Sequence, residues 1–274
     1  MPAAFAHDLF GRNVFMHLSK EIKDIIRSEK DCFYLGVHGP DILFYYRPLG
    51  KNPINQKGYD YHGRPAAEIF AHGLEVMRST EDAEEKRAIQ AYLLGFACHF
   101  ALDHSLHGDV NSLDENTEYT HAEIETELDR RLLTRAEMEP VRANTVCHIK
   151  NKKMTRFVAG KVLNEDERQI CEAIASFCAI NRLFVNSEEF FKRFIGVVMK
   201  AVGCYDKFGG MIMRKQETAG LEEVTDLLEE KFDKAAPYGA KLLEGLYASM
   251  KKRDSLPDAF WGNFEGINGD TWRL

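Results

Sequence analysis

The sequence predicts an all-α protein that folds as one compact domain. Apolar residues recur at helical spacing along most of the 274-residue chain, and no stretch of any length alternates apolar and polar residues as a β-strand does. Hydrophobic residues make up 45% of the composition, which is enough to bury a substantial core. We therefore expect a single domain over residues 1–274, with the chemistry-bearing residues in 1–135 and a helical remainder in 136–274.

The elements follow from the apolar spacing and from the positions of glycine and proline. Glycine and proline favour a loop over 35–50, and residues 51–64 indicate a second irregular stretch. Pro65 stands where proline often opens a helix, and Ser79 or Thr80 is expected to cap the next one. The aromatic segment 261–274 is expected to be irregular but docked. The expected helices cover residues 10–26, 66–77, 81–102, 121–133, 135–149, 164–185, 187–202, 222–235 and 239–252.

Charge and composition exclude several classes of protein. The net charge of −7 and the pI near 5.8 argue against a protein that binds nucleic acid or an anionic membrane over a wide surface. No apolar run reaches the roughly 18 residues that a transmembrane helix needs. No signal peptide is visible, and the six cysteines form no C-x-x-C pair, so we expect a cytoplasmic protein whose cysteines are reduced. We expect all six to be small buried hydrophobic residues.

Imidazoles and carboxylates cluster at helical spacing in the first half of the chain. His99, Asp103 and His107 are separated by four residues each, so they line one face of a helix. His121 and Glu125 repeat this spacing on the next expected helix. Burying Asp103 between two imidazoles is costly unless a metal ion neutralises the charge. The five residues therefore predict a metal site with nitrogen and oxygen ligands.

Three further residues are candidates, each with an ordinary structural alternative. Asp41 follows Gly39-Pro40 and could instead cap a short helix. His62 lies in the expected irregular stretch, where packing does not require histidine. His7 could be a capping or surface residue. Most other isolated histidines are interpreted as residues of half-buried helix faces, namely His17, His72, His104 and His148.

Taken in order, these residues resemble a known family. The series His7, Gly-x-x-x-Pro-Asp41, His62, His99-x-x-x-Asp103-x-x-x-His107 and His121-x-x-x-Glu125 is similar to that of the zinc-dependent phospholipase C family. That family resembles the single-strand-specific zinc nucleases in its all-helical fold and three-zinc centre. The resemblance covers residues 7 to about 130.

The resemblance implies two or three zinc ions with specific ligands. Asp41, His62, His99 and Asp103 would hold one zinc ion. A second would be held by His107, His121 and Glu125. His7 and Asp103 would contribute to a third.

This chain departs from the secreted members of the family at three points. Those enzymes complete the third site with an N-terminal tryptophan, whereas the first tryptophan here is Trp261. They place the histidine six residues after the aspartate, and His107 follows Asp103 by four. A secretion signal is also missing.

The resemblance implies hydrolysis of a phosphate ester, with a metal-activated hydroxide attacking phosphorus and Asp41 as a possible general base. The substrate would be a phospholipid head group or another diester. A phosphodiesterase or nuclease is the first alternative, in which tyrosines of 45–61 either stack on bases or only pack the loop. A non-catalytic helical protein with a structural metal is the second. A di-iron or di-manganese oxidase fits less well, because its Glu-x-x-His spacing is missing.

Overall fold

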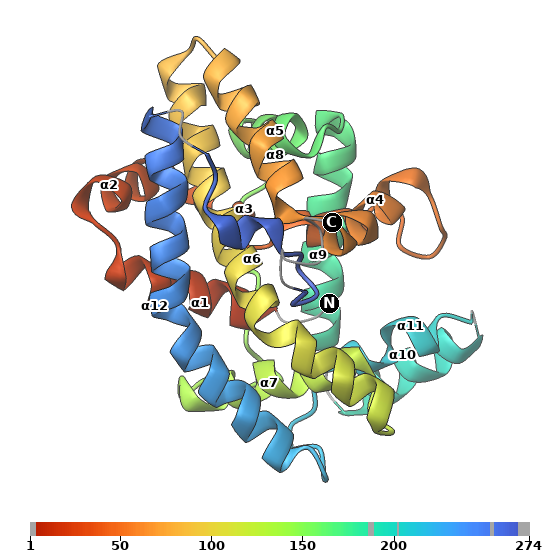
Figure 1. Cartoon of the computed structure of the whole chain (residues 1–274). Coiled ribbons are helices and arrows are strands. Elements are labelled where there is room, and N and C mark those ends of the chain that lie inside the picture. Colours follow the sequence, from red (N-terminus) through yellow and green to blue (C-terminus); the bar gives the residue numbers. More distant parts are fainter. Residues whose placement is uncertain (1–3, 186–188, 202, 253–254, 268–274) are drawn as a thin grey trace.

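The structure is a computed structural model that describes residues 4–185, 189–201, 203–252 and 255–267. Within these ranges the regular secondary structure consists of α-helices and short 3-10 helices without any strand, which confirms the all-α prediction (Figure 1). The elements are α1 (Ala4–His17), α2 (Lys20–Ser28), α3 (Lys30–Gly36), η1 (Gly39–Tyr45), α4 (Pro53–Gly63), α5 (Ala66–Ser79), α6 (Ala83–Asn116), α7 (His121–Arg135), α8 (Lys153–Leu163), α9 (Glu167–Val185), α10 (Glu189–Ala201), α11 (Tyr205–Phe208), η2 (Gly209–Met211), α12 (Glu222–Lys252) and η3 (Asp258–Trp261).

Helix α6 is the axis of the molecule. It has 34 residues and is therefore about 50 Å long. Its side chains from Leu93 to Asp103 are buried around the whole circumference, as expected for a helix with apolar residues on every face. Helices α1, α3, α5, α7, α8 and α12 pack against it, and Figure 1 shows α12 running along its length.

Two glycines allow α3 to cross α6 at very short range. A Cβ atom on Gly36 would lie 2.2 Å from the carbonyl oxygen of Tyr92, and one on Gly95 would lie 2.1 Å from that of Phe33. Any larger residue would force the two backbones apart. The crossing fixes the start of η1, which follows α3 directly and carries Asp41.

Several boundaries differ from the sequence prediction. Residues 51–64 are not irregular, since Pro53–Gly63 forms α4 behind a capping box between Asn52 and Asn55. Residues 35–50 are more ordered than expected because η1 occupies Gly39–Tyr45. The capping residue of α6 is Asp82, whose carboxylate accepts the Glu85 N–H, rather than Ser79 or Thr80.

Helix connections account for the remaining differences. The helix expected over 10–26 is two helices that meet near Ser19. Residues 136–152 form turns instead of the helix expected over 135–149, and α8 follows them without having been predicted. The two helices expected over 222–252 are one, because α12 continues through Pro237.

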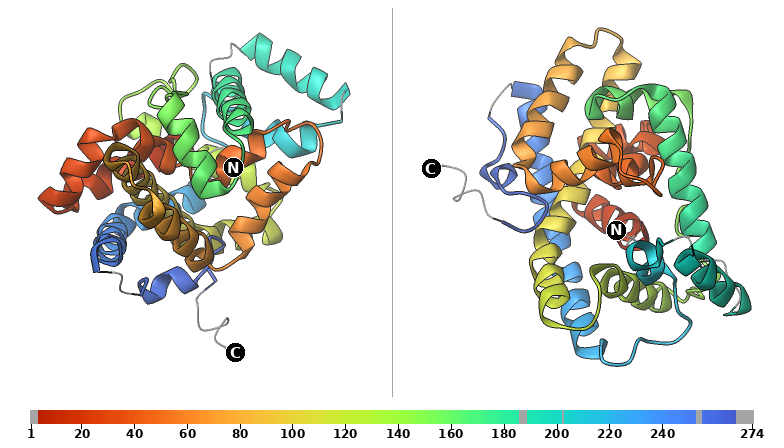
Figure 2. Two further views of the ribbon diagram at one scale, coloured as in Figure 1. Left: turned by 90° about the horizontal axis from the view of Figure 1, so that it is seen from above. Right: turned by 90° about the vertical axis from the view of Figure 1, so that its right-hand side faces the viewer.

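The aromatic C-terminal segment docks as predicted, as far as the structure describes it. Phe260 and Phe264 are fully buried, whereas Trp261 is exposed and residues 268–274 lie outside the described ranges. All six cysteines are free, but only Cys32 and Cys98 are buried as expected. The prediction is wrong for the other four, since Cys147 is exposed and Cys171, Cys178 and Cys204 are half-buried. In the described part of the chain no helix is long and apolar enough to cross a membrane. Figure 2 shows α10 and α11 at the edge of the molecule in two directions.

Candidate metal centre

Five elements bring all eight predicted ligands together beside the middle of α6. Helix α6 carries His99, Asp103 and His107 on one face. Helix α1 contributes His7, η1 Asp41, α4 His62, and α7 both His121 and Glu125. Seven of these side chains are buried, and only the His121 side chain, 26% exposed, reaches solvent.

Four of the residues form a first group. The Nε2 atom of His62 lies 3.0 Å from Asp41 Oδ1, and the Nε2 atom of His99 lies 3.1 Å from Asp103 Oδ2. The Nε2 atom of His62 is also 3.6 Å from Asp103 Oδ2. One potential ligand atom from each residue lies within 4.8 Å of all the others. Two imidazole nitrogens and two carboxylate oxygens are a donor set that suits zinc.

His107, His121 and Glu125 form a second group. The Oε1 atom of Glu125 lies 3.0 Å from His107 Nε2 and 3.1 Å from His121 Nε2. Their potential ligand atoms also lie within 4.8 Å of one another. Three protein donors with one solvent-facing side leave room for a further, exchangeable ligand, as in catalytic zinc sites.

The carboxylate of Asp103 lies between the groups. Its Oδ2 belongs to the first group, whereas its Oδ1 lies 3.6 Å from His107 Nε2 and 3.4 Å from His7 Nε2. A cavity of about 20 Å³, bordered by His7, Asp103, His107 and Glu125, lies beside it and could hold about one water molecule. This is the bridging position expected of Asp103. His7 is close enough to Asp103 for both to join a third site, as the resemblance implied.

The hydrogen-bonding pattern supports a metal rather than a purely hydrogen-bonded cluster. Asp41 Oδ1, His62 Nε2, His99 Nε2 and Asp103 Oδ2 are buried, yet none has a hydrogen bond of acceptable geometry to a described residue. Buried polar atoms without partners are rare and costly. Because these atoms converge on one point, a bound cation would satisfy them together. The residues present therefore fit zinc.

Hydrogen bonds from the second ring nitrogen orient three of the imidazoles. Nδ1 of His62 donates to the Gly58 carbonyl oxygen at 2.8 Å, and Nδ1 of His107 donates to that of Phe264 at 3.0 Å. Nδ1 of His121 lies 3.1 Å from Asn111 Oδ1. In the neutral imidazole each contact places the proton on Nδ1 and turns the free Nε2 toward the centre, which is the usual arrangement of metal-ligating histidines.

Gly39 makes room for the imidazole of His99. Its φ of +46° is in the left-handed region, and a Cβ atom there would lie 2.3 Å from His99 Cδ2. Gly39, two residues before Asp41, thus leaves the space that the ring of His99 occupies beside Asp41 in the first group. The sequence indicated the aspartate but not this role of the glycine.

Without a metal, the carboxylates hold protons on two of the imidazoles. Burial lowers the pKa of His62, but the Asp103 and Asp41 carboxylates outweigh it and raise that pKa to about 10. The pKa of His107 rises to about 9, since Asp103 and Glu125 outweigh burial in the same way. Burial and His99, which stacks on His7 at 4.4 Å, lower the pKa of His7 to about 4. Metal binding must therefore displace protons from His62 and His107.

Asp129 fixes the helix that carries His7. It lies one turn beyond Glu125 on α7, and its carboxylate accepts the backbone N–H groups of Phe5 at 3.0 Å and Ala6 at 2.8 Å. These are free donors in the first turn of α1. This contact joins residues that lie far apart in the chain, and no sequence pattern predicted it.

A second set of buried polar side chains adjoins the centre and was also missed. His38 Nε2 lies 2.7 Å from His148 Nε2, and His148 Nδ1 lies 3.5 Å from Asp8 Oδ2. Arg12 in turn binds Asp8 at 2.8 Å. His38 packs edge-on to His7 at a ring distance of 6.1 Å. His148 is thus part of a histidine pair rather than an isolated histidine.

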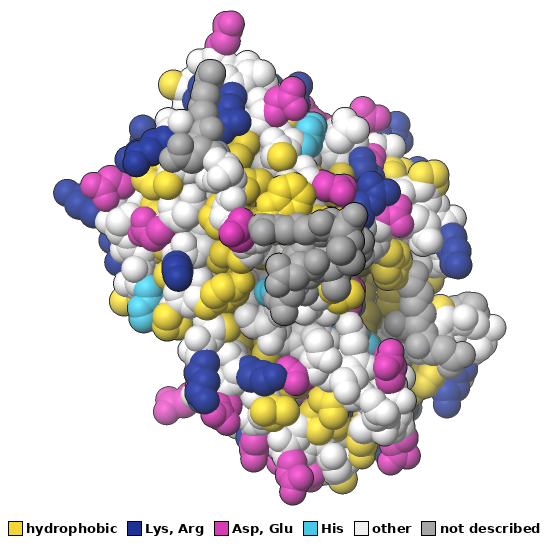
Figure 3. All heavy atoms as spheres, in the orientation of Figure 1, with side chains coloured by type: hydrophobic (Ala, Val, Ile, Leu, Met, Phe, Trp, Pro, Cys, Tyr) yellow, Lys and Arg dark blue, Asp and Glu magenta, His cyan; other side chains and the backbone are white. Residues whose placement is uncertain are grey.

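The tyrosines considered for base stacking are mostly occupied by packing. Tyr45 and Tyr46 are buried, and the ring of Tyr45 packs on Phe177. The Tyr61 hydroxyl donates to the Leu163 carbonyl oxygen. Tyr59 is exposed but its ring contacts Phe44. This disfavours a stacking platform for nucleic acid, and Figure 3 shows acidic and basic side chains interspersed over the face in view.

The chain matches a family of known proteins. The family described as zinc-dependent phospholipase C matches residues 5–180, which is more than half of the 274-residue chain and includes every residue of both ligand groups. No curated protein and no solved structure matches significantly.

Proposed function

Because this chain belongs to the zinc-dependent phospholipase C family, we propose that it is a zinc-dependent hydrolase that cleaves a phosphodiester of a phospholipid head group. The observation that carries the proposal is the pair of buried ligand groups joined through the two oxygens of Asp103. Each group would hold one zinc ion. His7 and Asp103 would contribute to a third.

Zinc bound in this centre would supply a Lewis acid for the phosphate and would make water nucleophilic near neutral pH. The residues of the chain would hold and orient the ligands. Gly58, Phe264 and Asn111 keep Nε2 of the three imidazoles turned inward, so that the ligands need no rearrangement on binding. Asp41 faces His62 and His99 with Oδ1, which favours a ligand role over that of a general base.

The substrate would approach from the side of His121. That residue is the first of α7, so the N-terminus of the helix, with its partial positive charge, lies at the exposed side of the centre. Arg214 adds a cation there and binds Glu123 at 3.2 Å. Both features suit an anionic phosphate. The buried tyrosines favour this substrate class over a nucleic acid.

Metal content and turnover, measured together, test the proposal. Purified protein should contain about two or three zinc ions per chain and should hydrolyse a phosphatidylcholine micelle and bis(p-nitrophenyl) phosphate. Chelation should abolish both reactions, and added zinc should restore them. A control series of phosphomonoesters should react much more slowly.

The decisive variant is His99→Ala, which removes a fully buried member of the first group. It should lose at least one zinc ion and lower the rate by about a thousandfold or more, since it takes away one of the two imidazole donors of the first group and leaves the remaining ligands unable to position the ion. The matched control is His104→Ala on the same helix, where the ring donates to the Asn263 carbonyl oxygen instead of facing the ligands.

Retention of full zinc and full activity by His99→Ala would refute the assignment. Full zinc without turnover in the wild type would favour a non-catalytic metal protein.

A further inference from the structure

Helix α10, at the edge of the molecule in Figure 2, exposes apolar side chains. Phe194 is 55% exposed and Val197 is 66% exposed, and Phe191 and Val198 are exposed as well. With 3.6 residues per turn, the four side chains project over an arc of about 120°. Contiguous exposed apolar residues of this kind mark an interaction surface.

The apolar surface continues into the neighbouring elements. Leu49, between η1 and α4, and Leu183 on α9 are exposed beside it. A groove of about 450 Å³ runs between these elements and α10, and every residue that lines it is hydrophobic. The exposed residues that form the surface, here named the apolar ridge, are Leu49, Leu183, Phe191, Phe194, Val197 and Val198.

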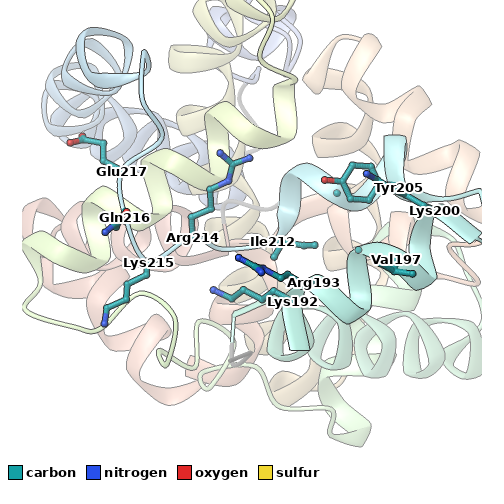
Figure 4. A pocket seen from close by; sticks show the side chains of 12 residues that line it. Lys192, Arg193, Val197, Lys200, Tyr205, Ile212, Arg214, Lys215, Gln216 and Glu217 are labelled. Carbon is teal, nitrogen blue, oxygen red and sulfur yellow. The ribbon is translucent and has the colours of Figure 1, made fainter. Parts of the chain in front are cut away.

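Basic side chains border the apolar ridge. Arg193 and Lys200 lie along one edge of the α10 arc, about 40–60° from Val197. Together with Lys192, Arg214 and Lys215 they line a pocket of about 850 Å³. Figure 4 shows the charged ends of Lys192 and Arg193 pointing toward the segment that carries Arg214 and Lys215.

The charge of this pocket is opposite to that of the chain. Five basic residues and one acidic residue, Glu217, line it, whereas the chain as a whole has a net charge of −7. Glu217 is paired with Arg131, Arg214 is paired with Glu123, and Lys192 is buried and donates to the Met213 carbonyl oxygen, so the exposed basic groups nearest to the apolar ridge are Arg193, Lys200 and Lys215. The positive charge is therefore local. It is too small in extent for a wide polyanion-binding face but sufficient to select an anionic partner at one place.

We propose that α10 docks this protein on the surface of an anionic phospholipid bilayer. The apolar ridge would enter the boundary between head groups and acyl chains, and Arg193, Lys200 and the basic pocket would contact lipid phosphates. An apolar helix face with a basic border is the pattern of helices that lie in a membrane interface. Anionic lipids attract such basic residues within about a Debye length. At 13 residues, α10 presents about 20 Å of helix to the surface.

The dimensions favour a bilayer over a second copy of the chain. A stable protein interface of standard size takes about 20–30 residues a side. The apolar ridge has six, four of them on α10 at the edge of the fold and two on neighbouring elements. A bilayer accepts a narrow projecting ridge without a complementary surface.

The docking helix is connected to the exposed side of the metal centre. The segment after α10 continues through α11 into η2, where a Cβ on Gly210 would lie 3.0 Å from the Cβ of Ala122. Ala122 is next to His121, the exposed member of the second ligand group. The docking itself does not rest on the proposed hydrolysis, although it would serve that reaction.

Co-sedimentation with vesicles tests the docking. Wild-type protein should bind vesicles of equal parts phosphatidylcholine and phosphatidylglycerol, less so as salt is raised, and should bind phosphatidylcholine vesicles at least about tenfold more weakly. The double variant Phe194→Glu, Val197→Glu should lose at least about tenfold in binding to the anionic vesicles. The double variant Arg193→Glu, Lys200→Glu should lose the preference for anionic vesicles.

Controls separate docking from folding and from catalysis. Leu227→Glu replaces an exposed leucine on α12 and should bind as the wild type does. Since the substituted positions are exposed, circular dichroism should show unchanged helicity, and hydrolysis of soluble bis(p-nitrophenyl) phosphate should be unchanged in all three variants. The inactive His99→Ala variant should still bind vesicles, so that failure of the proposed hydrolysis leaves this test intact.

Two results would overturn the proposal. One is equal vesicle binding by the wild type and both double variants, or no binding by any of them. The other is a concentration-dependent dimer in sedimentation analysis that Phe194→Glu abolishes, which would identify a second copy as the occupant. If α10 tolerates no charge substitution, Phe194→Ser and Val197→Ser give the same comparison with smaller changes.

Discussion

The first ligand group depends on a residue that cannot bind a metal. Gly39 lies against the His99 ring with a φ of +46°, so the chain passes from α3 into η1 without displacing that ring. The spacing of histidines and carboxylates made all eight ligand candidates visible in the sequence. The need for Gly39 was not visible, because it follows from the meeting of two elements that lie about sixty residues apart.

Substituting Gly39 by alanine should damage the metal centre without removing any ligand. The left-handed φ costs a non-glycine residue about 1–2 kcal/mol, and the added Cβ collides with His99. We expect Gly39→Ala to lower the zinc content and the melting temperature. Gly50→Ala is the control, since a Cβ there meets nothing within 4 Å. Elemental analysis and calorimetry measure both effects, and normal zinc content in Gly39→Ala would contradict this role.

The buried pair His38 and His148 should make stability depend on pH. Burial lowers the pKa of His148 to about 4 and that of His38 well below its usual value. Above about pH 6.5 both folded and unfolded chains carry neutral imidazoles, so this contribution to stability is complete. As the pH falls from 6.5 toward 4, the two imidazoles become protonated in the unfolded state but stay neutral in the folded state. The free energy of unfolding therefore decreases.

The variant His148→Gln should reduce that dependence. Its free energy of unfolding, measured by denaturant titration between pH 6.5 and 4, should fall less steeply than that of the wild type. The difference should be about 1.4 kcal/mol per pH unit for one proton. His17→Gln, at an exposed histidine on α1, should keep the wild-type slope. Identical slopes for wild type and His148→Gln would show that the pair does not stay neutral in the folded protein.

At the scale of elements, the helices and the breaks between them were unequally predictable. The apolar spacing predicted α5, α7 and α9 closely, because each buries one face. Helix α4 was missed because its glycines and tyrosines give no clear stripe, although Asn52-Pro53 is a helix start in retrospect. Pro237 suggested a break in α12, but the helix continues through it. The 135–149 region has the composition of a helix and forms turns instead.

The glycine crossing of α3 and α6 gives an element-scale prediction. In Gly95→Ala the Cβ would lie 2.1 Å from a backbone oxygen of α3, which cannot rotate away. We expect a loss of about 3 kcal/mol or more in the free energy of unfolding. Gly108→Ala, on the same helix with nothing near its Cβ, should instead gain up to about 1 kcal/mol. Urea titration of the two variants compares them, and equal stabilities would mean that the helices can separate at no cost.

For the whole molecule, the sequence predicted the fold class and the matched family, but not how distant segments meet. Nothing in the pattern of residues showed that Asp129 would hold the start of α1, or that Phe264 would lie against His99 and His107. Such contacts depend on the three-dimensional course of the chain. They join the helical remainder to the residues expected to bind metal.

Removing the metal should therefore destabilise the whole protein. The centre joins α1, η1, α4, α6 and α7, and zinc binds only their folded arrangement. Each tenfold excess of free zinc over the dissociation constant should add about 1.4 kcal/mol to stability. Calorimetry should show a melting temperature that falls with chelation and returns with zinc. The His99→Ala variant should show a smaller shift, and a melting temperature insensitive to chelation in the wild type would mean that the centre does not hold the fold together.

The contact of His107 with the Phe264 carbonyl oxygen has a consequence for synthesis. Translation produces His7 first and Phe264 near the end of the described chain, yet both are needed around Asp103 and His107. All eight ligand candidates leave the ribosome long before the residue that orients one of them. Metal loading would then be a late event, completed only after Phe264 has been synthesised. Zinc retention by nascent chains arrested before and after Phe264 measures that order, and full retention by the shorter chains would contradict it.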